Sequence, residues 1–219
     1  MTTVACYNFN NALEGATVYD DTGAHNGSVV GTVPLVTGPI SQKGRSFVGN
    51  ASNYISIPHH ADFKIDQNLS VEAWVRLGNV STYNSVLSKG NFTSTPAMDL
   101  MFYSTTHVYI YVSSNASNYI FAYAPYTTVL NNLYYLAATW DRTAKKLLLY
   151  INGVFVLAGA ETGTYTGGDT SLNVELGKRA YTGYFYPLTG SIYAVRWSNV
   201  VKTAKEIFDT YMAANVQET

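Results

Sequence analysis

The sequence predicts an all-β protein, a two-sheet antiparallel sandwich with one short C-terminal helix. Three observations predict this. Residues 133–159 contain three consecutive strand-like segments, Leu69–Leu77 alternates between apolar and polar positions, and about a dozen short strand-like segments follow one another with turn residues between them. Two layers are needed because antiparallel strands must bury their apolar face against another layer.

The segment 133–159 carries the strongest local signal. Tyr134–Trp140 and Lys146–Ile151 read as strands on either side of a polar turn, and Asn152-Gly153 separates the second strand from a third, Val154–Ala158. Asn-Gly favours a type I′ hairpin turn, because that turn requires positive φ at both central residues.

The run Leu69–Leu77 predicts a strand with two different faces. Its odd positions are apolar, whereas the even positions hold Ser70, Glu72, Trp74 and Arg76. Because Trp74 lies among polar neighbours, we expect this second face to be partly covered as well.

The remaining strands are short. A long loop follows the first of them, and Val33–Ile40, with its two prolines, is expected to be irregular. The other expected strands are Val4–Phe9, Ser46–Val48, Tyr54–Ile57, Val86–Ser88, Asp99–Tyr103, His107–Val112, Tyr119–Tyr123, Leu172–Leu176 and Ser191–Trp197.

A helix over about residues 203–214 is predicted at the end of the chain. Thr203 and Glu206 form a capping box, and apolar residues recur at helical spacing after it. We expect its apolar stripe to dock on the sheet edge. Because no low-complexity linker divides the chain, residues 1–219 are expected to form a single domain.

Composition excludes some partners. Charged residues make up 12% of the chain, against roughly 25% in an average globular protein. The formal net charge of −1 leaves no basic surface for nucleic acid. The 19 tyrosines indicate a surface whose rings pack while their hydroxyls stay hydrated.

The single cysteine, Cys6, cannot form an internal disulfide and is expected to be a buried small side chain. The N-terminal residues MTTVACYNFNNALEG lack a basic start and a long apolar core, so no signal peptide is expected. No run approaches the length of a membrane span.

The order of the segments resembles the laminin-G-like (LamG/pentraxin-type) branch of the concanavalin A-like lectin/glucanase superfamily. The resemblance implies a two-sheet antiparallel jelly-roll sandwich. It leaves the function open, because the fold carries lectins, adhesion domains, glycosidases, lyases and viral surface proteins. The matching residues are Tyr7–Phe9, Asp20–Gly23 with Asn26-Gly27, Ser46–Gly49, Tyr54–Pro58, Leu69–Val75, Ser88–Gly90, Tyr135–Asp141, Leu149–Gly153, Leu176–Lys178 and Gly190–Arg196.

Catalysis is not expected. Hydrolases of this superfamily typically place Glu-X-Asp-X-(X)-Glu along one strand, and the chain has no such cluster. Glu72, Glu161 and Glu175 are isolated, and Asp99 stands among apolar residues. A glycoside hydrolase or lyase therefore remains a remote alternative.

The four histidines have no recognisable nucleophile beside them, and no His/Cys metal spacing is present. His59-His60 is interpreted as a surface turn.

The resemblance implies a possible calcium site. Members of the family often bind Ca²⁺ at the rim of the sandwich, and Asp20, Asp21 and Asn26 match the early part of that site. Where many members read Gly-X-Ile-Asp-Glu late in the chain, this one has Gly190-Ser191-Ile192-Tyr193-Ala194, so two acids are missing. The alternative is an Asx turn that caps the loop.

Aromatic residues in loops are the candidate ligand-binding residues. One group is Lys178, Arg179, Tyr181, Tyr184, Phe185 and Tyr186, and a second is Tyr83, Asn91 and Phe92. Such rings can stack on sugars or contact a protein subunit, and the sequence supports both equally. Tyr109, Tyr111 and Tyr119 lie in predicted strands and are interpreted as sheet packing.

Two non-enzymatic functions compete. The first is a structural, decorating or adhesion component of an external particle such as a virion, which would contact copies of itself or capsid proteins. The alternative is a lectin-like module of an extracellular protein that binds glycans. Both predict an extracellular or virion-surface location.

Overall fold

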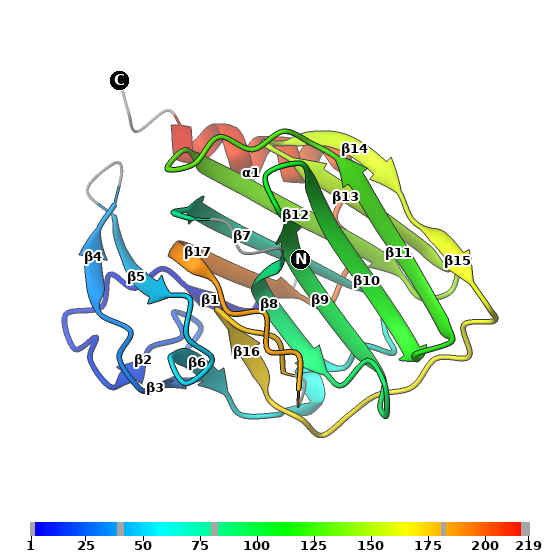
Figure 1. Cartoon of the computed structure of the whole chain (residues 1–219), viewed down its shortest axis with the longest axis horizontal. Coiled ribbons are helices and arrows are strands. Elements are labelled where there is room, and N and C mark those ends of the chain that lie inside the picture. Colours follow the sequence, from blue (N-terminus) through cyan, green and yellow to red (C-terminus); the bar gives the residue numbers. More distant parts are fainter. Residues whose placement is uncertain (1–2, 39–41, 80–82, 181–182, 216–219) are drawn as a thin grey trace.

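The computed structural model describes residues 3–38, 42–79, 83–180 and 183–215, and it confirms the predicted two-sheet sandwich with one helix (Figure 1). The strands are β1 (Thr3–Tyr7), β2 (Thr17–Val18), β3 (Gly27–Val30), β4 (Leu35–Thr37), β5 (Lys43–Val48), β6 (Tyr54–Ile57), β7 (Leu69–Leu77), β8 (Tyr83–Gly90), β9 (Ala97–Tyr103), β10 (His107–Asn115), β11 (Asn118–Pro125), β12 (Leu133–Asp141), β13 (Lys146–Ile151), β14 (Val154–Ala158), β15 (Ala160–Thr162), β16 (Val174–Leu176) and β17 (Thr189–Ser198). A 3-10 turn spans Ala61–Phe63 and helix α1 spans Ala204–Asn215.

Both sheets are antiparallel. Sheet A has the order β14-β13-β12-β7-β17-β5-β4, and β1 also pairs with β17. Sheet B has the order β15-β11-β10-β9-β8-β16-β6-β3-β2. Some neighbours in sheet A are consecutive in the chain, but β17 pairs with β1, β5 and β7, so the N-terminal strand, the centre and the end of the sequence all meet in one sheet.

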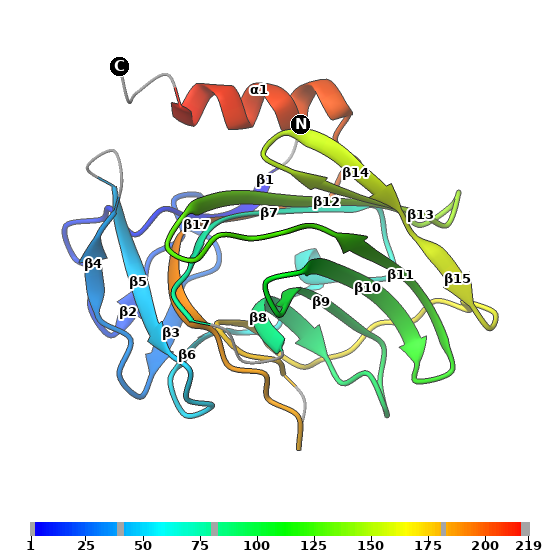
Figure 2. The same ribbon diagram turned by 45° about the horizontal axis from the view of Figure 1, so that its top comes forward.

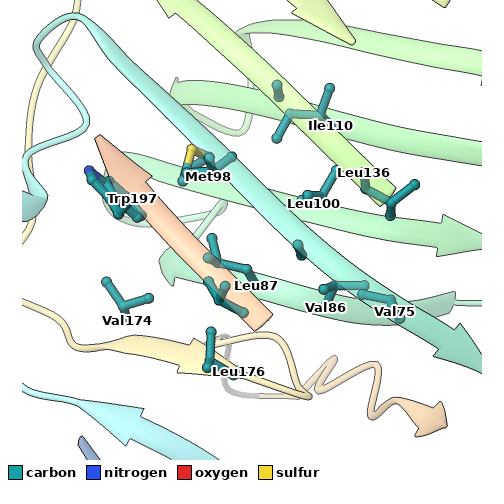
Figure 3. Packing of buried hydrophobic residues seen from close by; sticks show 14 of the residues in the cluster. Val75, Val86, Leu87, Met98, Leu100, Ile110, Leu136, Val174, Leu176 and Trp197 are labelled. Carbon is teal, nitrogen blue, oxygen red and sulfur yellow. The ribbon is translucent and has the colours of Figure 1, made fainter. Parts of the chain in front are cut away.

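The main core lies between the sheets. Figure 3 shows Val75 and Leu136 from sheet A close to Leu87, Leu100 and Ile110 from sheet B. All five side chains are at most 1% exposed. Because this core draws residues from β1 through β17, we propose that residues 1–219 form one domain.

Helix α1 covers the outer face of sheet A (Figure 2). Ile207 packs there with Tyr135 and Tyr150, and the Tyr211 ring stacks on Trp74 at a centroid distance of 5.8 Å. This arrangement confirms that the second face of Leu69–Leu77 is partly covered. Thr203 caps the helix as predicted, since the Glu206 carboxylate accepts bonds from its backbone N–H and its hydroxyl at 2.7 and 2.9 Å.

The three-strand unit of residues 133–159 is confirmed, with Asn152 and Gly153 both at positive φ. Three sequence interpretations differ from the structure. Val33–Ile40 is not wholly irregular, because β4 pairs with β5 there, and the long early loop contains β2 and β3. Leu172 and Asn173 lie outside the strand predicted for 172–176, which begins at Val174. Short strands have weak sequence signals because much of their stability comes from the neighbouring strands.

Candidate functional site

The outer face of sheet B is covered with aromatic side chains. Strands β9, β10 and β11 bury one set of alternating residues in the main core, so the other set must point away from it. The outward set pairs across the strands, with Tyr111 beside Asp99 and Phe121, and Tyr109 beside Met101 and Tyr123.

We name this surface the aromatic face. Its strand residues are Tyr83, Tyr103, His107, Tyr109, Tyr111, Tyr119, Phe121 and Tyr123, and the loop residues packed with them are Phe92 and Tyr186.

Two loops add their aromatic rings to this face. Tyr186 stacks on Tyr83 with ring centroids 4.1 Å apart, and Phe92 meets Tyr111 and Tyr119 edge to face at 5.0 and 5.2 Å. A further stack joins His107 to Tyr123 at 4.1 Å. The rings therefore form one continuous layer from strand β11 to the loop before β17.

Arg179 lies at the centre of this layer. Its Nε is 3.2 Å from Asp99 Oδ2, and its Nη2 donates to the Tyr111 hydroxyl at 2.7 Å. The guanidinium also lies within 5.0–5.6 Å of the ring centroids of Phe92, Tyr111 and Tyr186. One cation thus joins two strands, β9 and β10, and two loops.

Asp99 is fully buried beneath Arg179, and Ser85 Oγ donates to its Oδ1 at 2.6 Å. Burial raises the pKa of Asp99 to about 7, against the lowering effects of Arg179 and Ser85. Burial by itself would lower the pKa of Arg179, but the charge of Asp99 raises it above its ordinary value. In this pair the charge of Asp99 changes with pH around 7, whereas Arg179 stays positively charged.

Lys178 occupies the other side of the same backbone segment. Its Nζ lies 3.6 Å from the Tyr54 ring centroid, 5.3 Å from that of Phe185 and 3.4 Å from Glu175 Oε2. Burial raises the pKa of Glu175, while Lys178 acts in the opposite direction. The two carboxylates on this face, Asp99 and Glu175, are therefore each paired with a cation, Arg179 and Lys178.

The segment Lys178–Ala180 crosses directly over the sheet. Ser88 Oγ donates to the Lys178 carbonyl at 3.0 Å and accepts from the Ala180 N–H at 2.7 Å. Ser88 is aligned with Asp99 on one side and Glu175 on the other. The chain itself therefore fills the space between the two carboxylates.

The structure brings together most of the ligand-binding residues proposed from the sequence, although Tyr83 begins strand β8 and does not lie in a loop as expected. Tyr83, Phe92, Arg179 and Tyr186 contact one another on the aromatic face, and Lys178 lies beside them. Tyr181 lies outside the described residues.

The other proposed residues lie at the edge of this group. Tyr184 and Phe185 are 58% and 38% exposed, and the Tyr184 ring is 6.1 Å from that of Tyr186. Asn91 caps its own loop, since its Oδ1 accepts from the backbone N–H and the hydroxyl of Thr93.

Sequence reasoning missed the strand part of the aromatic face. Tyr109, Tyr111 and Tyr119 were interpreted as packing, and Phe121 and Tyr123 were not singled out. Tyr111 does pack, being 1% exposed, but the others are only partly covered. The signal was present: aromatic residues occur at alternate positions in consecutive strands.

The candidate calcium residues lie in the loop between β2 and β3. The carboxylate of Asp20 accepts bonds from the backbone N–H groups of Cys6, Thr22 and His25 at 2.8–3.0 Å and from the Thr22 hydroxyl at 2.5 Å. Asn26 Oδ1 accepts from the Asp20 N–H at 3.0 Å, and Asp21 is exposed.

These bonds hold the loop in shape without a metal. Burial alone would raise the pKa of Asp20, but the bonds from Cys6, Thr22 and His25 lower it below its ordinary value. A calcium ion would compete with them for the same oxygens, and its binding by Asp20, Asp21 and Asn26 stays a prediction.

A cavity of about 560 Å³ lies between α1 and sheet A. Glu72, which lines this cavity, already has partners. It pairs with Lys202, and its Oε1 accepts a hydrogen bond from the Tyr135 hydroxyl at 2.5 Å. We therefore regard the aromatic face as the stronger candidate site.

The family described as "Concanavalin A-like lectin/glucanases superfamily" matches residues 48–208. No curated protein sequence matches the chain. None of the described helices is long and apolar enough to cross a membrane.

Solved structures share the fold at low identity. Domain 4 of AbnA, a GH43 extracellular arabinanase from Geobacillus stearothermophilus solved with arabinotriose, is 19% identical at a TM-score of 0.71, with 94% of this chain and 97% of that chain covered. The binding domain of botulinum neurotoxin serotype G is 10% identical at a TM-score of 0.74, covering 97% of this chain and 51% of its own.

A botulinum neurotoxin type C structure, from work on cell entry that depends on two ganglioside molecules, is 11% identical at a TM-score of 0.72. It covers 96% of this chain and 51% of its own length. The chain thus spans about half the length of these neurotoxin domains, and the similarity confirms the fold.

Replacing Asp20 by Ala should lower the free energy of unfolding by about 2–4 kcal/mol, because it leaves buried N–H groups without acceptors. Urea unfolding in excess chelator measures this, with Asp21→Ala as the control and an expected change within about 0.5 kcal/mol. If the loss appears only when calcium is present, the carboxylate serves the ion and not the loop.

Replacing Asp99 by Asn should remove a pH-dependent part of the stability. Because the folded-state pKa of about 7 exceeds the unfolded value, the folded protein binds the extra proton, and stability falls as pH rises from about 4 to 7. The stability of D99N relative to the wild type should therefore increase across this range in urea unfolding. The exposed helix residue Asp209→Asn is the control, and a pH-independent difference for D99N would contradict the assignment.

Proposed function

Because the chain belongs to the concanavalin A-like lectin/glucanases superfamily, we propose that it is a non-catalytic binding module that takes saccharides on the aromatic face of sheet B. The observation that carries this proposal is the continuous layer of partly exposed rings described above. Sugars present flat C–H surfaces that stack on aromatic rings. Their hydroxyls need polar partners close by, and the tyrosine hydroxyls can supply these.

The electrostatics of the face also suit a neutral ligand. Its buried charges pair with one another, Arg179 with Asp99 and Lys178 with Glu175. A sugar hydroxyl can bond to the outer atoms of such pairs without leaving a charge unpaired. The arabinotriose bound in one structural neighbour, domain 4 of AbnA, is a neutral saccharide of this kind and supports the proposal.

The absence of catalysis is part of the proposal. A glycosidase needs two carboxyl groups with free space between them for the scissile bond or a water molecule. Here the segment Lys178–Ala180 is bonded to Ser88 between Asp99 and Glu175, and each carboxylate faces a cation. This arrangement argues against a hydrolase mechanism at the aromatic face.

A glycan array followed by calorimetry with the hits tests the proposal. Tyr123→Ala and Tyr186→Ala should each weaken binding by about fivefold, the loss expected for about 1 kcal/mol of ring contact. Phe155→Ala removes a ring that is 50% exposed on strand β14 of sheet A, away from the aromatic face, and should leave affinity unchanged.

Absence of any saccharide binding by the wild type would contradict the proposal. Equal losses in all three variants would show that the ligand does not lie on the aromatic face.

A second candidate is a subunit of an external particle, for example a virion, with an extracellular or virion-surface location. Its support is an exposed apolar patch on the other side of the molecule, formed by Val154 and Phe155 of β14 with Phe208 and Met212 of α1. Each of these side chains is 41–61% exposed. Exposed patches of this kind favour contact with another protein.

Light scattering at increasing concentration tests this second candidate. If the patch joins copies of the chain, the mass should rise with concentration, and Phe208→Ser should abolish the rise because it places a polar group in the contact. Lys205→Ser, on an exposed part of the same helix, is the control. A monomer at all concentrations would contradict self-assembly through the patch.

A further inference from the structure

A cluster of metal-binding side chains lies where two loops meet, away from the aromatic face. His25 comes from the loop between β2 and β3, while His60 and Asp62 come from the 3-10 turn after β6. One ligand atom from each lies within 4.8 Å of the others. His25 Nε2 and His60 Nδ1 are each 3.1 Å from the same oxygen, Asp62 Oδ2.

His25 is held rigidly in this cluster. Its side chain is 8% exposed, and its ring lies 4.8 Å from that of Phe63 and 4.6 Å from that of His60. Its backbone N–H donates to Asp20 at 3.0 Å, and its carbonyl accepts from the Tyr7 hydroxyl at 2.6 Å. The imidazole is therefore placed before any ligand arrives, which lowers the entropy cost of binding.

The hydrogen bonding of His60 leaves an unfavourable contact. Its Nδ1 accepts the backbone N–H of Asp62 at 3.2 Å, so this nitrogen carries a lone pair. The same nitrogen lies 3.1 Å from the carboxylate oxygen, which also offers lone pairs. Two such atoms repel each other unless a proton or a metal cation lies between them. Because the nitrogen has a single lone pair, a metal ion bound there would replace the bond from the Asp62 N–H.

Two of the three ligand separations suit a tetrahedral metal ion, and the third, between His25 and His60, is within 4.8 Å and would close as the ion binds. Zinc binds histidine nitrogen and carboxylate oxygen at about 2.0–2.2 Å, which separates neighbouring ligands by about 3.3–3.5 Å. The two separations of 3.1 Å reach this range after a small outward movement. His60 and Asp62 side chains are 55% and 43% exposed, so water can complete the coordination.

We propose that His25, His60 and Asp62 form a zinc-binding site. The ion joins two loops whose ligands are 37 residues apart in the sequence, His25 and Asp62. Because the start of β3 pairs with the end of β6, the loop before β3 and the turn after β6 lie at the same end of these strands, and the ion clamps this edge of the sandwich. Zinc should raise the melting temperature, since it binds the assembled cluster and not the unfolded chain.

Calorimetric titration of the tag-free, chelator-treated full chain with zinc chloride tests the site. The wild type should bind one ion per chain, and His60→Ala and Asp62→Asn should each weaken binding by about tenfold or more. These two exposed positions carry the test because His25 is buried and its replacement can also disturb the loop. His59→Ala is the matched control, since its ring faces Lys89 and not the cluster.

Cobalt(II) gives an independent readout, because a tetrahedral nitrogen and oxygen site produces visible absorption bands that the His60→Ala variant should lose. Absence of zinc binding by the wild type overturns the proposal. Unchanged zinc affinity in both His60→Ala and Asp62→Asn also overturns it, because the ion must then be held elsewhere.

Discussion

Burial of apolar side chains between the two sheets is the constraint on which the rest of this structure depends. Strands alternate, so a strand that places Leu100 or Ile110 in the core must turn its other residues outward. In strands β10 and β11 the outward residues are mainly tyrosine and phenylalanine, whereas β9 contributes Tyr103 beside Ala97, Asp99 and Met101. A one-residue slip in register would exchange the two sets and place tyrosine hydroxyls in the apolar core. The core thereby determines the composition of the candidate site.

Loops complete the site because buried polar groups need partners. Asp99 lies on the aromatic face yet is fully buried, so it requires Arg179 and Ser85 around it. The segment Lys178–Ala180, which carries Arg179, is attached to the sheet through hydrogen bonds to Ser88. The carboxylate, the arginine and the crossing backbone thus depend on one another, and the backbone lies over Ser88, which pairs with both Asp99 and Glu175.

The fold could be predicted from local patterns. The alternation of Leu69–Leu77, the Asn152-Gly153 turn and the capping box of Thr203 each depend on nearby residues, and each appears in the structure as expected. The site could be predicted only in part. Tyr83, Phe92, Arg179 and Tyr186 were selected from loops, whereas the strand tyrosines of the same face were assigned to packing. Alternation identifies two faces of a strand, but it does not say which neighbouring elements cover the outer one.

The sequence by itself determined the two-sheet architecture, the terminal helix and the family, because these follow from periodicity, turns and the order of short motifs. Only the tertiary structure decided which distant residues meet. Asp99 and Arg179 are 80 positions apart, and His25 and Asp62 show no metal-binding spacing along the chain. Their proximity depends on strand pairing and loop paths, which bring together residues from separate turns of the chain. Chemistry that requires groups within about 3 Å of one another is therefore settled by packing and not by local sequence.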